Sequence, residues 1–345
     1  MRSRRIKGTM AVLTALLLLG GCQGSEEPYL KKAEQYMEKA EYGLALDDYN
    51  KAIMEDEDLQ EAYRGAGIAN LKMADYQAAE DMFLRALKES DGMIGKTEED
   101  LSYYLGEVQI CLGKYKEAAS CYSNIIEFDE EELWAYFYRG SAYLQMDEQE
   151  KAKKDFDRAA KEGDSRLLYG IYEAYESKGS DAGTSYLEQI VKKKAETDEE
   201  LYIQGRAYYK LGEEAKALEI LEKCGKKEYQ ALFYLGAIYE QRGEYDQAVS
   251  YYNSYKDKKG LTFGEYRTVA ECMMKKGDYA AALELNHYMK ESAGNSETKD
   301  LMFEEIVIYE RSSDFASART AAQAYVEQYP EDEEGKKEYE FLQTR

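Results

Sequence analysis

Apolar and small residues recur three and four positions apart along most of the chain from position 28 onward, which is helical spacing rather than the alternation of a strand. The clearest example is Leu235–Tyr239, which is followed, after the polar turn at Gly243 and Glu244, by a second such run from Tyr245 to Tyr252. This pattern predicts two short helices joined by a tight turn.

The pattern returns with a period close to 34 residues. Aligning the chain on itself at Gly236 gives nine equivalent positions, all but one small: Ala33, Gly67, Gly106, Gly140, Gly170, Gly205, Gly236, Ala270 and Ile306. An alanine follows twelve residues later each time: Ala45, Ala79, Ala118, Ala152, Ala182, Ala217, Ala248, Ala282 and Ala318. Four residues further on, a ring or large apolar group is usual: Tyr49, Phe83, Tyr122, Phe156, Tyr186, Leu221 and Tyr252, with Asn286 and Ala322 as exceptions. Because a helical glycine costs about 1 kcal/mol relative to alanine, the regularity predicts close helix contacts and helix pairs that stack on their neighbours.

The combination of Leu235, Gly236 and Tyr239 with a later alanine and aromatic residue resembles the tetratricopeptide repeat (TPR), whose period is 34 residues. Near matches to its first half occur at 139–143 and 204–208. The resemblance covers nearly all of the mature chain. It implies an all-α, right-handed superhelical α-solenoid of about nine helix pairs over residues 28–330.

Helix ends follow the same phase. Three turns pair a glycine with an aromatic residue two positions later, which predicts a helix that ends at the glycine: Gly113–Tyr115, Gly243–Tyr245 and Gly277–Tyr279. Two segments that begin with threonine, Thr97–Asp100 and Thr197–Glu200, predict capping boxes. Acidic clusters at 56–58 and 129–132 occupy helix starts, where the helix dipole favours anions.

Two regions depart from the pattern. The unit at Gly170 follows the shortest interval and has Lys178–Gly179 where other units have a turn aromatic, so we expect an irregular stack there. After Pro330, residues 331–345 predict a polar C-terminal capping helix with Tyr339 and Phe341 on its inner face.

Residues 1–21 have the features of a secretory signal. Basic residues precede an uncharged run from Met10 to Leu19, which is too short to span a bilayer core that needs about 20 residues. The sequence Leu19-Gly20-Gly21-Cys22 resembles the lipobox of bacterial lipoproteins, which implies that Cys22 is lipidated and that residues 22–27 form a tether. An ordinary cleaved signal is the alternative. We therefore expect an extracytoplasmic protein that acyl chains on Cys22 hold at the cell membrane of a bacterial envelope.

Charge and motifs exclude several function classes. With 46 basic and 69 acidic residues, the net charge of −23 disfavours binding to nucleic acid. The segment Gly92–Thr97 only superficially resembles a P-loop, because Ser90 stands where the motif needs glycine and no strand precedes it, so no nucleotide is expected. His287 is the single histidine, and no nucleophile motif accompanies it. We expect no catalytic residue, no cofactor and no enzyme activity.

Cysteines do not form a metal pattern either. We expect the four that remain after Cys22 to be buried small apolar residues, with disulfides as the alternative: Cys111, Cys121, Cys224 and Cys272. No zinc motif and no twelve-residue calcium loop is present, so no metal is expected.

The TPR resemblance implies a concave groove lined by the first helix of each pair. The residues that fall on it are Tyr103, Trp134, Phe137, Leu167, Tyr202, Arg206, Tyr209, Lys210 and Phe233, with Arg64, Arg267 and Lys275 nearby. Aromatic and arginine residues are frequent anchors at interfaces, although several of these side chains are expected only to pack between helices. The sequence therefore predicts a membrane-anchored scaffold that binds an envelope protein or peptide in this groove. A self-associating structural protein is the alternative, and an enzyme is less favoured.

Overall fold

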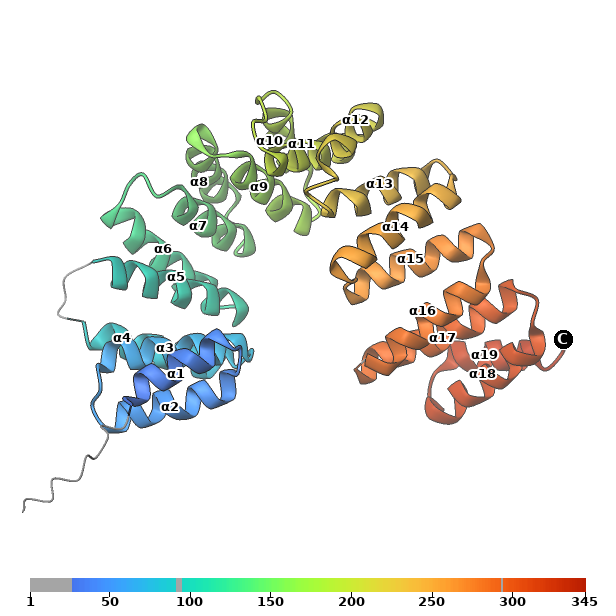
Figure 1. The fold of residues 1–345 in the computed structure, drawn as a ribbon, viewed down its shortest axis with the longest axis horizontal. Coiled ribbons are helices and arrows are strands. Elements are labelled where there is room, and N and C mark those ends of the chain that lie inside the picture. Colours follow the sequence, from blue (N-terminus) through green and yellow to red (C-terminus); the bar gives the residue numbers. More distant parts are fainter. Residues whose placement is uncertain (1–26, 91–94, 293) are drawn as a thin grey trace, which may run out of the picture. The chain divides into compact units, whose positions relative to one another are not determined.

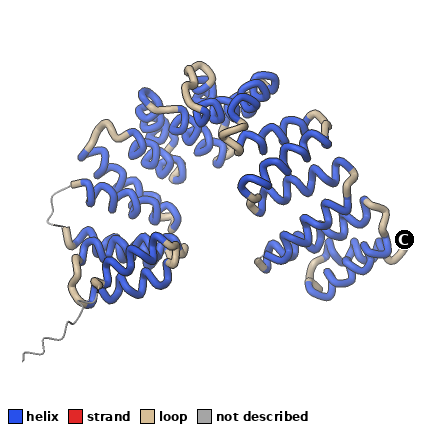
Figure 2. The backbone as a smooth tube through the Cα atoms, viewed as in Figure 1, coloured by secondary structure: helices blue, strands red, loops and turns tan. Residues whose placement is uncertain are grey.

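The computed structural model describes residues 27–90, 95–292 and 294–345. Throughout these ranges the secondary structure is helical (Figure 2). None of the helices in them is both long and apolar enough to cross a membrane. The predicted signal segment and the lipidation site at Cys22 lie outside the described residues.

The chain divides into two compact units, residues 1–128 and 129–345. The described part of the first unit contains α1 (Tyr29–Glu38), α2 (Tyr42–Met54), α3 (Leu59–Lys72), α4 (Tyr76–Lys88), α5 (Lys96–Cys111) and α6 (Tyr115–Phe128). Consecutive helices pack as the pairs α1–α2, α3–α4 and α5–α6, and α2 and α4 also contact the next pair.

The second unit begins with three pairs, the second of which contains a short 3₁₀ helix: α7 (Leu133–Gln145), α8 (Gln149–Glu162), α9 (Ser165–Ser177), η1 (Asp181–Gly183), α10 (Thr184–Ile190), α11 (Asp198–Lys210) and α12 (Glu214–Cys224). It continues with α13 (Gln230–Gln241), α14 (Tyr245–Lys259), α15 (Phe263–Lys276), α16 (Tyr279–Ser292), α17 (Asn295–Arg311), α18 (Phe315–Gln328) and α19 (Glu333–Leu342). Figure 1 shows the helices of this unit following one another as stacked hairpins. The prediction of an all-α chain of nine helix pairs with a C-terminal helix is confirmed.

In four of the nine pairs, a ring on the second helix packs against a glycine on the first. The ring position lies sixteen residues after the small position, as Tyr252 lies after Gly236. A Cβ atom built on Gly236 would lie 2.6 Å from the Tyr252 ring, and one built on Gly67 would lie 2.5 Å from the Phe83 ring. The same ring contact occurs for Gly106 with Tyr122 and for Gly140 with Phe156, and the aliphatic side chain of Leu221 covers Gly205 in the same place. The predicted close contact is confirmed, but a side chain rather than a second backbone makes most of it.

The turn inside every pair contains one left-handed residue. In these nine turns the left-handed residue has φ between 57° and 86°: Ala40, Ala74, Gly113, Asp147, Gly179, Gly212, Gly243, Gly277 and Ser313. The following N–H closes the turn, as when Glu244 donates to the carbonyl of Tyr239 at 2.9 Å. The three predicted glycine turns are confirmed, and four further turns adopt the same conformation without glycine.

Replacing Ala74 by glycine is expected to stabilise the first unit by about 0.5–1 kcal/mol, because a left-handed L-residue with a side chain is strained. Ala74 is exposed and has φ of 60°, so no packing is lost. Gly113→Ala is the reverse control, because its φ is 71° and its added Cβ would meet no atom within 4 Å. It should destabilise by a similar amount, and urea unfolding of both variants measures the difference. An unstable Ala74→Gly variant would contradict the assignment.

One of the predicted helix starts needs correction and three are confirmed. The Thr197 and Glu200 capping box is present, and Asp58 accepts the N–H of Glu61. At the start of α5, however, Gly95 rather than Thr97 is the N-cap, and Glu98 accepts its N–H at 2.9 Å. In the cluster at 129–132 the capping side chain is Glu132, which accepts the N–H of Trp134.

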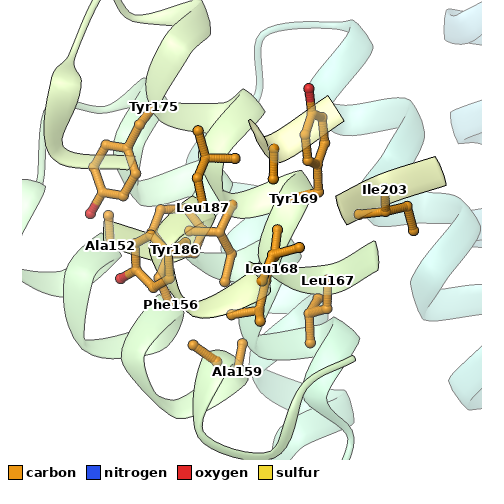
Figure 3. Close-up of a cluster of buried hydrophobic side chains, with 14 of the residues drawn as sticks. Ala152, Phe156, Ala159, Leu167, Leu168, Tyr169, Tyr175, Tyr186, Leu187 and Ile203 are labelled. Atoms are coloured by element: carbon orange, nitrogen blue, oxygen red, sulfur yellow. The ribbon is translucent and has the colours of Figure 1, made fainter. Parts of the chain in front are cut away.

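The irregular fifth pair is confirmed, with a shift of one residue. Ala182 is exposed, and Gly183 takes the buried place that alanine has in the other pairs. A Cβ atom on Gly183 would lie 3.0 Å from the Cα of Tyr172, which is a true backbone contact. The pair still keeps its ring, because Tyr186 is 4% exposed and lies in the cluster with Phe156 (Figure 3).

The last two pairs replace the ring in different ways. In the ninth pair the sizes are exchanged, because Ile306 occupies the small position and Ala322 the ring position, and both are fully buried in one cluster. In the eighth pair Asn286 occupies the ring position, where its Nδ2 donates to the carbonyl of Leu301 at 3.1 Å.

The prediction for the C-terminal helix is partly wrong. On α19 the inward residues are Leu342, which is fully buried, and Tyr339, which packs on the cluster around Tyr325. Phe341 is 44% exposed and lies under the guanidinium of Arg345 instead.

Candidate functional site

The predicted groove residues do not all serve one site. Tyr103 lies on α5 of the first unit, where its ring packs at 6.1 Å from that of Tyr122. On α7, Trp134 meets Phe137 edge to face at 5.5 Å. Leu167 is only 1% exposed and belongs to the core around α9, so its assignment to the groove is wrong.

Three of the predicted residues come together in the second unit. Tyr202 and Tyr209 on α11 and Phe233 on α13 line a pocket of about 470 Å³. The remaining lining residues come from α13, α14 and α15: Gln230, Tyr234, Ala237, Tyr255, Glu265 and Thr268. We call this set the tyrosine pocket. Its size lies in the range of about 300–1,000 Å³ that is usual for ligand sites.

Ring contacts hold the walls of the tyrosine pocket. Tyr234 packs edge to face against Tyr202 at 6.0 Å and against Tyr209 at 5.7 Å. Phe233 packs in the same manner against Tyr255 at 5.5 Å. Such pairs contribute about 0.5–1.5 kcal/mol each beyond the area they bury, so the pocket is formed before any ligand enters.

Hydrogen bonds fix the polar atoms of the wall. The hydroxyl of Tyr255 donates to Oε1 of Glu265 at 2.9 Å, and the N–H of Thr262 donates to Oε2 of the same carboxylate at 2.8 Å. The hydroxyl of Tyr209 accepts from Gln241 at 2.9 Å. Burial, followed by the hydrogen bond to Glu265, raises the pKa of Tyr255 to about 12, so this hydroxyl stays neutral at physiological pH.

The basic residues predicted for the groove form ion pairs between adjacent repeats. Arg206 pairs with Glu173 at 2.9 Å, and Lys210 pairs with Glu176 at 2.8 Å. Each carboxylate lies on the preceding first helix, about one repeat earlier in the chain. Arg64 with Asp100, Arg267 with Glu304, and Lys275 with Glu240 span adjacent pairs in the same way.

Arg206 has the least exposed side chain of the basic residues that form these ion pairs. Its guanidinium lies 3.9 Å from the centroid of the Tyr169 ring, and its Nε donates to the hydroxyl of Tyr234 at 3.0 Å. Arg206 therefore supports the wall of the tyrosine pocket from behind. These basic residues join adjacent repeats, and their predicted role in anchoring a partner stays a prediction.

Six of the nine lining residues of the tyrosine pocket were not predicted from the sequence. Tyr255 lies on the second helix of its pair, outside the set that the TPR resemblance supplied. Glu265 could have been found, because Thr262 and Glu265 form a capping box that is visible in the sequence. Gln230, Tyr234 and Thr268 carry no sequence signal beyond their helical phase.

The cysteines and the histidine suggest no further chemistry. Cys224 and Cys272 are buried as expected, and burial raises the pKa of each thiol to about 11. Cys121 is half-buried, whereas Cys111 is exposed, against the prediction. Among the described residues, no group of three potential ligands is placed to hold a metal ion. His287 lies at the surface beside Glu305, at 2.9 Å.

Comparison with known families identifies the repeats. The tetratricopeptide repeat model matches residues 134–162, 201–228 and 230–258. These segments coincide with the pairs α7–α8, α11–α12 and α13–α14, and the last two contain the aromatic residues of the tyrosine pocket. The chain therefore contains tetratricopeptide repeats. No curated protein matches it.

Several solved structures resemble the chain at low overall similarity. YrrB, described as a TPR protein with an unusual peptide-binding site, is 27% identical over 48% of this chain and 84% of its own, with a TM-score of 0.39. A tetratricopeptide repeat protein from Parabacteroides merdae is 18% identical over 83% and 99%, with a TM-score of 0.43. The Cut9-Hcn1 hetero-tetramer of the APC/C is 12% identical over 92% and 90%, with a TM-score of 0.45.

Proposed function

We propose that the chain is a non-catalytic scaffold which holds a segment of another envelope protein in the tyrosine pocket. One observation carries this proposal. Tyr202, Tyr209 and Phe233, which the TPR resemblance assigns to the groove, line one open pocket. The matched tetratricopeptide repeats support it, because arrays of this kind form extended binding surfaces.

The proposed address strengthens the mechanism. A lipid on Cys22 and a tether of residues 22–27 keep the scaffold at the outer face of the cytoplasmic membrane. The scaffold and a membrane-bound partner then share a thin layer, so their effective concentration rises without any new contact. A modest affinity in the pocket is sufficient under these conditions.

The pocket is tested by photo-crosslinking in cells. Benzoylphenylalanine replaces Thr268, which lines the pocket and whose hydroxyl donates only to the carbonyl of Gly264 in its own helix. A discrete crosslinked partner is expected. The same group at Glu222, an exposed residue of α12 outside the pocket, is the control and should give no such band.

A variant with a filled pocket is the negative control for the crosslinking experiment. Ala237 is half-buried and lines the open space, so Ala237→Phe should occupy the pocket without compressing the core. The crosslink at position 268 should then disappear while the helical circular dichroism signal is unchanged. A band that persists in the filled variant, or the absence of any band in the original chain, would contradict the proposal. A captured second copy of the chain would favour self-association instead.

Membrane attachment has its own test. Cys22→Ala is expected to accumulate as an uncleaved precursor, because lipidation of that cysteine would precede cleavage. Metabolic labelling with a fatty-acid probe and the shift in mass on a gel measure the effect. A variant that is still processed to the mature size and found with the membrane would reject the lipobox assignment.

A further inference from the structure

We infer that the side chain which enters the tyrosine pocket is basic, a lysine or an arginine of the partner segment. This inference rests on the proposed function and specifies its chemistry. The tyrosine pocket combines aromatic faces with one carboxylate among its lining residues, and Arg206, Lys210 and Lys275 in the neighbouring repeats are each paired with a glutamate. Each of these features is considered in turn.

Aromatic rings dominate the lining. Five of the nine lining residues are tyrosine or phenylalanine, and they surround the small side chain of Ala237. A ring presents negative charge density on its face, so a cation within about 6 Å of the ring centroid is attracted to it. Arg206 already shows this preference in the same wall, where it lies 5.4 Å from the centroids of both Tyr202 and Tyr234.

Glu265 is the charged member of the lining. Its two oxygens are held by Tyr255 and by the N–H of Thr262, so the carboxylate is fixed in place. Both hydrogen bonds are donated to the carboxylate, and its oxygens have further lone pairs that can accept from a cation in the pocket.

The surrounding cations are neutralised. Arg206, Lys210 and Lys275 each form an ion pair with a glutamate of an adjacent repeat, at 2.7–2.9 Å. An acidic partner would have to break these pairs, whereas a basic partner leaves them intact. The net charge of −23 on the whole chain favours the approach of a basic segment as well.

Two acceptor groups in the wall have unused hydrogen-bonding capacity. The side-chain carbonyl of Gln230 has no hydrogen-bond partner among the described residues, and the carboxylate of Glu265 can accept more than the bonds it has. An ammonium or guanidinium group carries only donors. The hydrogen-bonding capacity of the pocket thus complements a basic side chain better than an acidic one.

The test uses small probes on the full chain purified in mild detergent. Titrations followed by saturation-transfer NMR compare the N-methylamides of N-acetyl-arginine, N-acetyl-lysine, N-acetyl-norleucine and N-acetyl-glutamate. Arginine and lysine probes are expected to bind about fivefold more tightly than norleucine, in keeping with cation–π attraction at a partly exposed site. The glutamate probe should bind most weakly.

Two variants isolate the charge. Glu265→Gln can keep the cap on α15, since glutamine also serves in a capping box, and it should reduce the preference for basic probes to less than about twofold while the norleucine Kd stays unchanged. Glu271→Gln is the matched control on the same helix, because Glu271 is exposed and does not line this pocket, and it should preserve the preference. Ala237→Phe should abolish binding of all probes.

The outcomes separate the inference from the proposal on which it rests. Equal affinity for norleucine and arginine, or unchanged discrimination in Glu265→Gln, would overturn the inference even when crosslinking at position 268 captures a partner. Tighter binding of choline than of either basic probe would overturn it in favour of a lipid headgroup. Absence of a crosslinked partner despite selective probe binding would instead reject the proposed function and leave the cation site standing.

Discussion

Gly236→Leu is expected to destabilise the second unit by about 3 kcal/mol, because overpacking a filled core costs about 1–3 kcal/mol and this site has little room to adjust. Even the first added carbon would lie 2.6 Å from the Tyr252 ring. That ring is fully buried, and its hydroxyl donates to Glu240 at 2.8 Å, so the ring cannot move aside without breaking the bond. Thermal and urea unfolding of the purified chain measure the loss.

Gly264→Leu is the matched control in the same unit. Gly264 also lies in a helix, yet a Cβ atom there would meet no atom within 4 Å. Removing this glycine should change stability by less than about 1 kcal/mol, the range of helix propensity. If Gly236→Leu melts at the temperature of the original chain, or if both variants lose the same stability, the ring contact does not hold the pairs together.

The helix pairs could be predicted from the sequence because small side chains recur at fixed positions in both helices of each pair. Eight of the nine alanines that follow the small positions are fully buried, and each lies where two helices of a pair meet. The prediction for Ala182 was wrong because the second helix of the fifth pair is preceded by a 3₁₀ turn, so Gly183 is the buried residue instead. A single-residue shift of this kind leaves the period of the sequence almost unchanged, so alignment could not detect it.

The left-handed conformation of the turn residue could be predicted only where that residue is glycine. Gly113 and Gly243 indicate a left-handed residue, but Ala40, Ala74 and Ser313 adopt the same conformation without any such signal. In these turns the stacked helices impose the conformation on the backbone, and local preference is overridden. The similarity of all nine turns is therefore a property of the array.

The candidate site was harder to predict, because its decisive contacts join residues that are far apart in sequence. Tyr202, Tyr209 and Phe233, which the TPR resemblance assigned to the groove, line one pocket, and their role in binding stays a prediction. It could not show that Arg206 and Lys210 are paired with glutamates 33 and 34 residues away, since acidic residues are abundant at every phase. The aromatic residues of the tyrosine pocket could thus be selected from the sequence. The ion pairs that neutralise the nearby basic residues became visible only in the structure.

The ninth pair allows the rule to be tested by exchange. Ala322→Phe alone should cost about 1–3 kcal/mol by overpacking, because Ile306 and Ala322 are both fully buried. Ile306→Gly alone should cost at least about 3 kcal/mol, since it opens a cavity and also introduces a helical glycine. The double variant recreates the glycine and ring that four of the other pairs use, at the same spacing of sixteen residues.

The two substitutions should therefore be strongly coupled. We expect the double variant to be more stable than the sum of the single effects by about 1–3 kcal/mol, the range seen for residues in direct contact. Urea unfolding of the four proteins in this cycle gives the coupling free energy. Additive effects would mean that the exchanged sizes of Ile306 and Ala322 are independent accidents. A positive coupling would show instead that the two positions fill one shared volume between the helices of a pair. In the ninth pair the large residue that fills it comes from the first helix, at Ile306, instead of from the second.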